Sequence, residues 1–295
     1  MVANTAIVMG TILALFGAEE RVYTVDRDVV YVEPEGKELR ATLYLPKATQ
    51  EARPAIVLIH GGGWFFGGRR QQAWYCRAFA KRGYVVMAIE YRKMFGHPFP
   101  DCVYDCKAAV RWLRRNADKY RVDPDAIGAF GASAGGHLAG MLATTSAEDG
   151  FEGDSGHDIS SRIGAAVILY GAVDLSAYRE KGGLATRYLA RFVGARSKEE
   201  RPAALERASP VTYVKPSACP VLLVHGAGDS LVHLEQARRF HDRLRAAGVP
   251  TRLIVVANHG HGFDYIHWRQ RRRLFEEMVA FLEVHLGGPP AASTG

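Results

Sequence analysis

A serine between two glycines is the clearest sign of chemistry in this chain. Residues 131–135 read Gly-Ala-Ser-Ala-Gly and match the G-x-S-x-G pattern. The motif lies between a short apolar run, 127–130, and a stretch of small residues that predicts a helix starting at Ala134. A sharp strand-to-helix turn exposes the serine oxygen, and glycines on either side avoid clashes within the turn. We therefore predict that Ser133 is a nucleophile.

Three consecutive glycines provide a second signal. The sequence His60-Gly61-Gly62-Gly63-Trp64 directly follows the apolar run 55–59. Such a run weakens regular structure, but it allows backbone N–H groups to approach a ligand oxygen closely. We predict that the N–H groups of Gly62, Gly63 and Ala134 form an oxyanion hole. A flexible turn is the alternative interpretation.

A serine nucleophile needs a base, and the base needs an acid that orients it. Among eleven histidines, His259 and His261 lie in a loop after the last predicted strand, and the pattern alone leaves both open. Asp229 follows another predicted strand and precedes His261 by 32 residues, in the order Ser-Asp-His. Asp174 and Asp264 compete for the role of the acid. We interpret Asp174 as fixing a loop and Asp264 as capping the last helix.

Strand and helix signals alternate along the chain, and the candidate residues follow predicted strands. The predicted strands are 22–32, 39–45, 55–59, 85–89, 127–130, 165–170, 221–225 and 253–256. The predicted helices are 72–82, 101–120, one starting at 134, 234–247 and 268–286. This alternation predicts an α/β fold with a mostly parallel sheet of about eight strands, the first two antiparallel, and helices on both faces.

Two segments interrupt the alternation. The polar segment 144–163 predicts a surface loop. The segment 172–219 contains a helix-like piece at 185–192 and follows a predicted strand. Because ligands bind at the carboxyl ends of strands in open α/β sheets, this insertion is a candidate partial lid.

The motifs form an ordered series that resembles a known family. The series is His60–Trp64, Glu90–Arg92, Phe99-Pro100, Asp105, 109–113, 131–139, 170–175, 225–232 and His261–Phe263. It resembles the esterase/lipase group of the α/β-hydrolase superfamily, in its hormone-sensitive-lipase-like and bacterial feruloyl-esterase-like branch. The resemblance runs from about Val22 to Leu286. It implies the α/β-hydrolase fold, a Ser133, Asp229 and His261 triad, and His261 rather than His259 as the base.

The resemblance also implies an activity. The expected reaction is hydrolysis of short-chain acyl esters by a serine carboxylesterase, because no lipase-type cap precedes the first core strand. The substrate is then a small-molecule ester or one linked to a polysaccharide, such as acetyl or feruloyl esters of plant polysaccharide. Trp64 and Phe65 are candidate pocket residues. One alternative is an amide hydrolase, such as an aryl-formamidase or an exopeptidase, and another is a catalytically inactive hydrolase-fold binding protein.

Composition excludes several other classes. With 295 residues, 48% hydrophobic and 23% charged, the chain is expected to fold as one domain over 19–295. The formal charge of +7 includes four arginines within 269–273, which we interpret as a solvated helix face, and no nucleic-acid motif accompanies them. No Cys/His cluster has zinc spacing, and hydrolysis by a Ser-Asp-His triad needs neither a metal nor an organic cofactor, so none is expected. Cys102 and Cys106 are expected to be buried thiols.

The first 18 residues differ from the rest of the chain. They carry no charged side chain, and 7–16 is almost entirely apolar. The segment is similar to a secretory signal and favours a secreted or periplasmic protein over a cytoplasmic one. An uncleaved helix on the domain or on a membrane surface is the alternative. The rest of the chain contains no apolar run long enough for a stable membrane span, and the sequence leaves the oligomeric state undefined.

Overall fold

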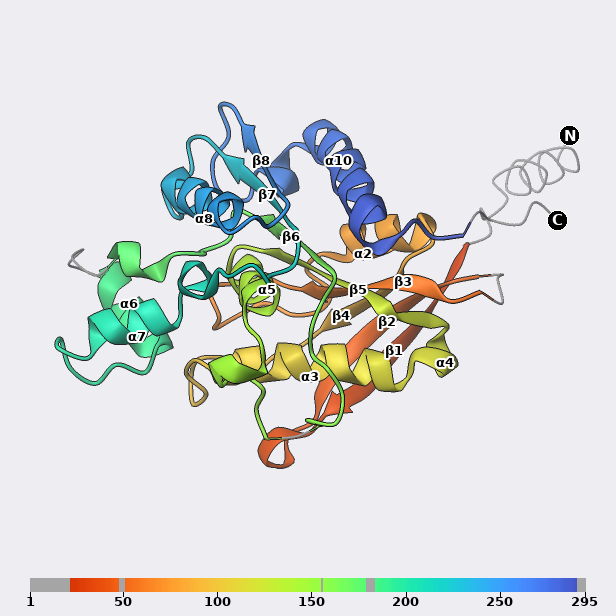
Figure 1. The fold of residues 1–295 in the computed structure, drawn as a ribbon, viewed down its shortest axis with the longest axis horizontal. Helices are drawn as coiled ribbons and strands as arrows, with labels where there is room; N and C mark the ends of the chain where they lie inside the picture. Colours follow the sequence, from red (N-terminus) through yellow and green to blue (C-terminus); the bar gives the residue numbers. More distant parts are fainter. Residues whose placement is uncertain (1–21, 48–50, 155, 179–183, 291–295) are drawn as a thin grey trace, which may run out of the picture.

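A computed structural model describes residues 22–47, 51–154, 156–178 and 184–290, so the prediction for residues 1–18 lies outside the described residues. An eight-stranded sheet forms its centre, with the order β1-β2-β4-β3-β5-β6-β7-β8 (Figure 1). Its strands are β1 Tyr23–Val32, β2 Leu39–Pro46, β3 Arg53–Ile59, β4 Val85–Ile89, β5 Val122–Ala132, β6 Ala165–Leu169, β7 Val221–Gly226 and β8 Thr251–Val256. The predicted α/β class and strand number are confirmed.

The strand directions follow from the lengths of the connections. β1 and β2 are joined by the short turn Pro34–Gly36 and pair antiparallel, as predicted. β2 also pairs antiparallel with β4, so β2 alone runs against the rest of the sheet. Every pair from β4 to β8 is parallel, because helical crossovers join those strands. The carboxyl ends of the parallel strands therefore meet at one edge of the sheet.

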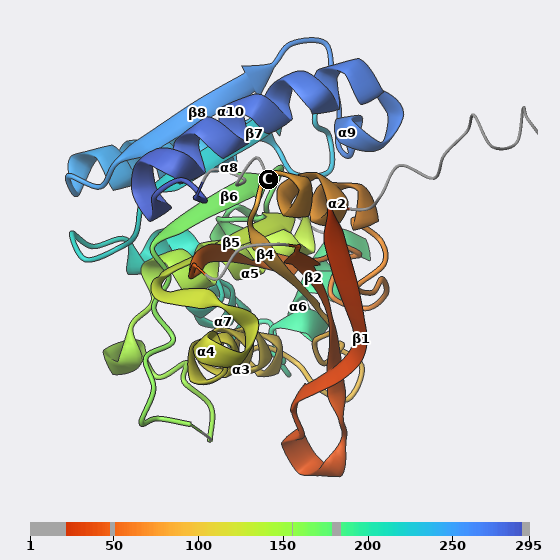
Figure 2. The same ribbon diagram turned by 90° about the vertical axis from the view of Figure 1, so that its right-hand side faces the viewer.

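Helices cover both faces of the sheet. They are α2 Ala73–Lys81, α3 Asp101–Arg115, α4 Ala117–Tyr120, α5 Ala134–Thr144, α6 Leu184–Phe192, α7 Arg201–Arg207, α8 Leu234–Ala246, α9 Phe263–Ile266 and α10 Trp268–Leu286. Two apolar cores result: α2 and α10 pack with one face of the sheet, and α3, α5 and α8 pack with the other (Figures 1 and 2). Along β3, Ile56 and Leu58 enter the first core while Val57 and Ile59 enter the second. The uninterrupted apolar runs of the sequence thus follow from burial on both faces.

The predicted helix 101–120 is wrong in one respect, because it is divided at Asn116. Asn116 has φ −103° and ψ 20°, and its side-chain Nδ2 donates a hydrogen bond to the Trp112 carbonyl over 2.8 Å. An asparagine side chain competes in this way for backbone groups that would otherwise continue the helix. The chain therefore ends α3 there and forms the short α4.

The segment 144–163 is less solvent-exposed than its polar composition predicts. Phe151 is fully buried, and the Glu152 carboxylate accepts hydrogen bonds from Lys107 and Arg111, each over 2.6 Å. Lys107 and Arg111 are themselves buried on α3. Two buried cations need a carboxylate partner, and Glu152 draws its loop onto the domain to supply one.

The insertion 172–219 carries α6 and α7, which lie together at one end of the molecule (Figure 1). Its helix-like piece is present as α6, beginning one residue earlier than predicted. All four cysteines are free and buried. Within the described ranges, no helix combines the length and the apolarity that crossing a bilayer requires.

Candidate active site

Ser133 occupies a strained turn between β5 and α5. Its φ of 56° and ψ of −120° lie outside the regions that L-residues normally adopt. A Cβ at Gly131 would collide with the carbonyl oxygen of Gly135, and one at Gly135 would collide with that of Ile59. Glycines at both positions are therefore needed for the turn to pack against the neighbouring strand. The turn leaves the Ser133 side chain in a cavity at the carboxyl edge of the sheet.

The structure joins Ser133, His261 and Asp229 in one hydrogen-bonded chain. His261 Nε2 lies 2.9 Å from Ser133 Oγ, and His261 Nδ1 lies 2.8 Å from Asp229 Oδ2. An ionised carboxylate can only accept hydrogen bonds, so Nδ1 of His261 carries the ring proton. Nε2 is then free to accept the hydroxyl hydrogen of Ser133. In this arrangement Ser133 can act as a nucleophile, His261 as its base and Asp229 as the group that orients the base.

Four donors lie around the buried carboxylate of Asp229, and one of them is shared with a carbonyl. In addition to His261, the N–H groups of Leu231 and Val232 donate to Oδ1 over 3.0 and 2.9 Å. His225 Nε2 donates to the Val232 carbonyl over 2.8 Å and also lies 3.3 Å from Oδ2. Burial alone would raise the pKa of Asp229. The hydrogen bonds from His225, His261 and Val232 outweigh burial and hold that pKa well below its usual range. Asp229 therefore stays ionised in the folded protein at neutral pH.

The glycine run presents two anchored peptide planes to the cavity. His60 Nδ1 donates to the Gly61 carbonyl over 2.6 Å, and the Gly62 carbonyl accepts from the N–H groups of Phe65 and Phe66. In a trans peptide the C=O and the following N–H point in opposite directions. Fixing the carbonyls of Gly61 and Gly62 therefore directs the N–H groups of Gly62 and Gly63 away from these partners. Within the described residues, neither N–H donates to another protein group.

A third donor is available at the start of α5. Ala134 is the first residue of that helix, where an N–H has no intrahelical partner, and no side chain caps this end. Gly62, Gly63 and Ala134 all line the same cavity as Ser133. The three predicted oxyanion donors are thus brought together beside the serine. Their role in stabilising an oxyanion remains a proposal that substitution can test.

His60 is held neutral in the orientation that the glycine run requires. Burial, together with the nearby charge of Lys93, lowers the pKa of His60 to about 3. Lys93 Nζ donates to His60 Nε2 over 2.8 Å, which leaves the single ring proton on Nδ1 for the Gly61 carbonyl. The His60 ring also stacks on Tyr91 with centroids 4.4 Å apart. His60 therefore serves the site through backbone orientation.

The cavity above Ser133 has a volume of about 630 Å³ and is mainly apolar. Among the described residues that line it, none is Asp, Glu, Lys or Arg. The insertion contributes Tyr178, Tyr188 and Leu189 to the wall, and the Tyr188 hydroxyl donates to the Gly63 carbonyl. The segment 172–219 thus both encloses the cavity and contacts the glycine run.

The two candidate pocket residues occupy different environments. Phe65 lies at the cavity with 41% of its surface exposed, together with the similarly exposed Phe66. Trp64 lines the cavity but is only 5% exposed, since its ring stacks on Phe192 at 4.1 Å and its Nε1 donates to His137 Nδ1. Phe65 is therefore positioned to meet substrate, whereas most of Trp64 belongs to the core.

Asp264 does not cap the last helix, so that interpretation was wrong. It is buried in α9 and accepts hydrogen bonds from Tyr75 over 3.1 Å and from Tyr170 over 2.5 Å, while α10 begins after His267 without a side-chain cap. The Tyr170 ring packs edge-on against His261 with centroids 4.7 Å apart. Asp264 thereby fixes a tyrosine that supports the His261 ring. Sequence reasoning gave Tyr170 no role in the site, although the residue begins the family motif 170–175.

His259, the alternative base, and Asp174, the alternative acid, lie outside the cavity of Ser133. His259 is partly exposed, and its Nδ1 donates to the Ala257 carbonyl over 2.6 Å. Asp174 is buried, accepts hydrogen bonds from Arg239 and Ser176, and also receives an ion pair from Arg239. Neither residue lines the cavity. Asp174 thus fixes a loop, in agreement with its interpretation from the sequence.

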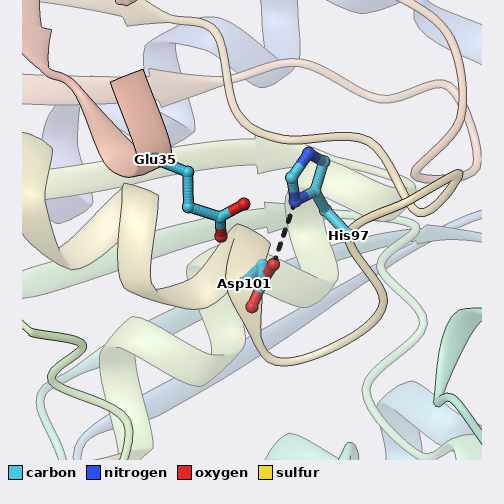
Figure 3. Close-up of side chains that lie close together, drawn as sticks. All are labelled: Glu35, His97 and Asp101. Carbon is cyan, nitrogen blue, oxygen red and sulfur yellow. Dashed lines mark hydrogen bonds and ion pairs between the residues drawn. The ribbon is translucent and has the colours of Figure 1, made fainter. Parts of the chain in front are cut away.

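One cluster of metal-ligating side chains occurs among the described residues. Glu35, His97 and Asp101 have ligand atoms within 4.8 Å of one another, and Figure 3 shows the His97 ring turned toward Asp101. The Arg92 guanidinium lies 3.2 Å from both the Glu35 and the Asp101 carboxylates. A cation in that position neutralises both acids and competes with a metal ion. The cluster is best explained as an ion-pair network, and none of its members lines the cavity of Ser133.

Substitution of Gly62 by alanine is expected to lower kcat by roughly 10²–10³, the loss that removal of one oxyanion donor typically causes. Gly62 has φ +111°, and a Cβ there would collide with the Phe66 carbonyl oxygen, so the donor must move. Gly68→Ala is the matched control, because a Cβ at Gly68 meets no atom within 4 Å. Equal activity of the two variants, measured with a soluble ester, would remove Gly62 from the oxyanion hole.

Comparison with known proteins identifies the family. The sequence profile of the BD-FAE family matches residues 42–244. Esterase LipC of Mycobacterium tuberculosis is 30% identical over 237 residues, which are 79% of this chain and 59% of LipC. Esterase LipQ of the same organism is 32% identical over 249 residues, which are 82% of this chain and 58% of LipQ. The chain thus spans less than two thirds of the length of these relatives.

Solved structures match over nearly their whole length. A truncated carbohydrate esterase from gut microbiota has a TM-score of 0.78 and 27% identity, covering 90% of this chain and 99% of that one. A thermophilic esterase of Thermogutta terrifontis has a TM-score of 0.75 and 29% identity, and the match covers 92% of this chain and 98% of that esterase. The matched fold and the family profile agree with the order of motifs along the sequence. The chain belongs to the BD-FAE family, in the esterase group of the α/β-hydrolases.

Proposed function

We propose that this protein is a serine carboxylesterase that hydrolyses short-chain acyl esters through Ser133, His261 and Asp229. The observation that carries the proposal is the hydrogen-bonded chain of these three residues beneath an apolar cavity. The names of the relatives as esterases support it. No cofactor takes part in the proposed reaction.

The proposed reaction has two halves. Ser133 Oγ attacks the ester carbonyl carbon while His261 Nε2 takes the hydroxyl proton, and the N–H groups of Gly62, Gly63 and Ala134 bind the resulting oxyanion. Collapse breaks the bond to the alcohol, which leaves with the proton from Nε2. Water then attacks the acyl-enzyme, again giving its proton to His261, and the carboxylic acid is released as Ser133 recovers its hydrogen.

The lining of the cavity favours neutral esters over the alternative amide substrates. An exopeptidase must bind a terminal ammonium or carboxylate group, and an aryl-formamidase acting on N-formylkynurenine must bind both charges. A buried charge without a partner is costly, and the described lining residues include no Asp, Glu, Lys or Arg to pair with it. The third alternative, an inactive binding protein, would have no need for the triad geometry described above.

Short acyl chains are favoured by two observations. The Thermogutta terrifontis esterase was solved with propionate and with butyrate bound. In this chain the insertion brings the Tyr188 hydroxyl to the Gly63 carbonyl, so that this side chain occupies space beside the proposed oxyanion donors. The cavity of about 630 Å³ is larger than a short acyl group needs, so small-molecule and polysaccharide-linked acetyl esters are both candidate substrates.

A panel of p-nitrophenyl esters tests the proposal. We expect kcat/KM to be highest at about two to four acyl carbons, because further CH₂ groups remain outside the pocket and lose their burial energy of about 0.8 kcal/mol each. Acetylated xylan, methyl ferulate and N-formylkynurenine extend the panel, and Ser133→Ala gives the background rate. A preference for long acyl chains would show that the insertion builds a deep tunnel. Turnover of N-formylkynurenine alone, or failure of a fluorophosphonate to label Ser133, would refute the esterase assignment.

A further inference from the structure

Exposed apolar side chains gather at the cavity of Ser133. Four of its lining residues are both large and exposed, and we call them the apolar mouth; they are Phe65, Phe66, Leu231 and Tyr265. They come from three separate connections at the carboxyl edge of the sheet, after β3, β7 and β8. Single exposed apolar residues are normal on a protein surface, whereas a group of them around one cavity is typical of a site that binds apolar groups.

The proposed reaction restricts where the alcohol part of an ester can lie. The alcohol oxygen must receive the proton from His261 Nε2 as it leaves, so it lies within hydrogen-bond distance of that atom. The carbonyl oxygen is instead directed to the N–H groups of the glycine run and of Ala134. The acyl chain and the alcohol group leave the carbonyl carbon in different directions. The part of the apolar mouth that adjoins His261 therefore faces the alcohol group.

Leu231 and Tyr265 are the members of the mouth that adjoin His261. The Leu231 N–H donates to Asp229 Oδ1 over 3.0 Å, and the other oxygen of this carboxylate holds His261 Nδ1. Tyr265 belongs to α9, which follows His261 directly, and its N–H donates to the Gly262 carbonyl over 3.1 Å. Both side chains line the cavity, although Leu231 is 63% exposed and Tyr265 is 49% exposed. An alcohol group bound there would remove this apolar surface from water.

The cavity offers few partners to the hydroxyl groups of a sugar. The Tyr178 hydroxyl already donates to the Leu231 carbonyl over 2.8 Å, and the Tyr188 hydroxyl donates to the Gly63 carbonyl. Among the described lining residues, Gln71 is the single amide side chain, and none is Asp, Glu, Lys or Arg. A sugar carries several hydroxyls, and each one withdrawn from water without a partner costs free energy. An apolar alcohol group avoids this cost.

We propose that the alcohol part of the substrate is an apolar alkyl or aryl group, and that Leu231 and Tyr265 determine this specificity. The inference rests on the esterase function proposed above, and it decides between the two substrate classes named there in favour of small-molecule esters. The two ends of the ester are then selected differently, because the acyl group is short while the alcohol group is extended and apolar. Each CH₂ of the alcohol that becomes buried raises kcat/KM by up to about fourfold.

A series of acetyl esters tests the proposal, because it varies the alcohol alone. Every member forms the same acetyl-enzyme on Ser133, so differences in kcat/KM report the alcohol group. We expect kcat/KM to rise from ethyl through propyl and butyl to pentyl acetate, by up to about fourfold for each CH₂. 2-Ethoxyethyl acetate matches pentyl acetate in chain length but carries an ether oxygen in place of one CH₂. Pentyl acetate should exceed it by at least about fourfold, because the oxygen loses its hydration on binding.

Two variants test the residues themselves. The ratio of kcat/KM for pentyl acetate to that for 2-ethoxyethyl acetate should fall in Leu231→Ser, and it should come within about twofold of one when Tyr265→Ser is added. Val284→Ser is the matched control, because Val284 is an exposed apolar residue of α10 that does not line the cavity, and it should keep the ratio of the unmodified chain. Partial unfolding lowers both rates equally and leaves the ratio unchanged, so the ratio separates specificity from stability.

Several results would overturn the inference. Equal kcat/KM for pentyl and 2-ethoxyethyl acetate would show that the mouth does not select apolar alcohols. An unchanged ratio in both variants would remove Leu231 and Tyr265 from the alcohol site, and a higher kcat/KM for acetylated xylan, counted per acetyl group, would assign the site to sugars. In each of these cases hydrolysis itself still occurs and the esterase proposal stands. If the unmodified chain hydrolyses no ester of the series, the esterase proposal fails first and the inference fails with it.

Discussion

Substitution of His261 by alanine is expected to lower kcat for a short-chain ester by on the order of 10⁶, the scale seen when the base of a serine protease triad is removed. The reason is that His261 Nε2 is the acceptor 2.9 Å from Ser133 Oγ, and no other described side chain forms a hydrogen bond with that oxygen. Without it the hydroxyl proton has no acceptor in the cavity. Burst and steady-state kinetics with p-nitrophenyl acetate measure the effect.

His259→Ala is the matched control, because His259 belongs to the same loop. Its ring lies 4.5 Å from that of His267, and its Nδ1 donates to the Ala257 carbonyl, so it faces away from Ser133. We expect this variant to keep most of its activity. If His259→Ala abolished turnover while His261→Ala retained it, the proposed base would be wrong.

The second large effect is expected from Asp229→Asn, with a loss in kcat of about 10⁴, as in the serine proteases. The carbonyl oxygen of asparagine can still accept hydrogen bonds from the N–H groups of Leu231 and Val232. Its NH₂ group would then face His261 Nδ1, and two donors cannot share one bond. The His261 ring should respond by moving its proton to Nε2, which removes the base.

Asp174→Asn provides the corresponding control for the acid. Asp174 is equally buried and is paired with Arg239, so this variant should lose stability while keeping most of its kcat. Thermal unfolding and circular dichroism would separate the two effects. Full activity of Asp229→Asn, combined with loss of activity in Asp174→Asn, would transfer the role of the acid to Asp174.

Local pattern was sufficient to predict the fold class, which is confirmed, and to single out Ser133 as the candidate nucleophile. Each parallel strand is buried on both faces, which requires a short run of apolar residues that is visible without any partner. The turn at Ser133 leaves no space for a side chain at Gly131 or Gly135, so its glycines are also a local requirement. The family resemblance rested on the same local motifs, and it is confirmed.

Contacts between distant residues decided the rest. His259 and His261 differ by two positions, and the residue pattern alone left both open; the contacts of His261 with Asp229 and with the Tyr170 ring hold its ring toward Ser133. Asp264 carries the sequence signature of a cap, but it lies between two tyrosines from other elements. The contact between α2 and α10 joins residues 194 positions apart, as the Arg82–Glu276 pair shows. A sequence encodes local conformation through propensity and periodicity, whereas such pairings depend on how the sheet orders its strands.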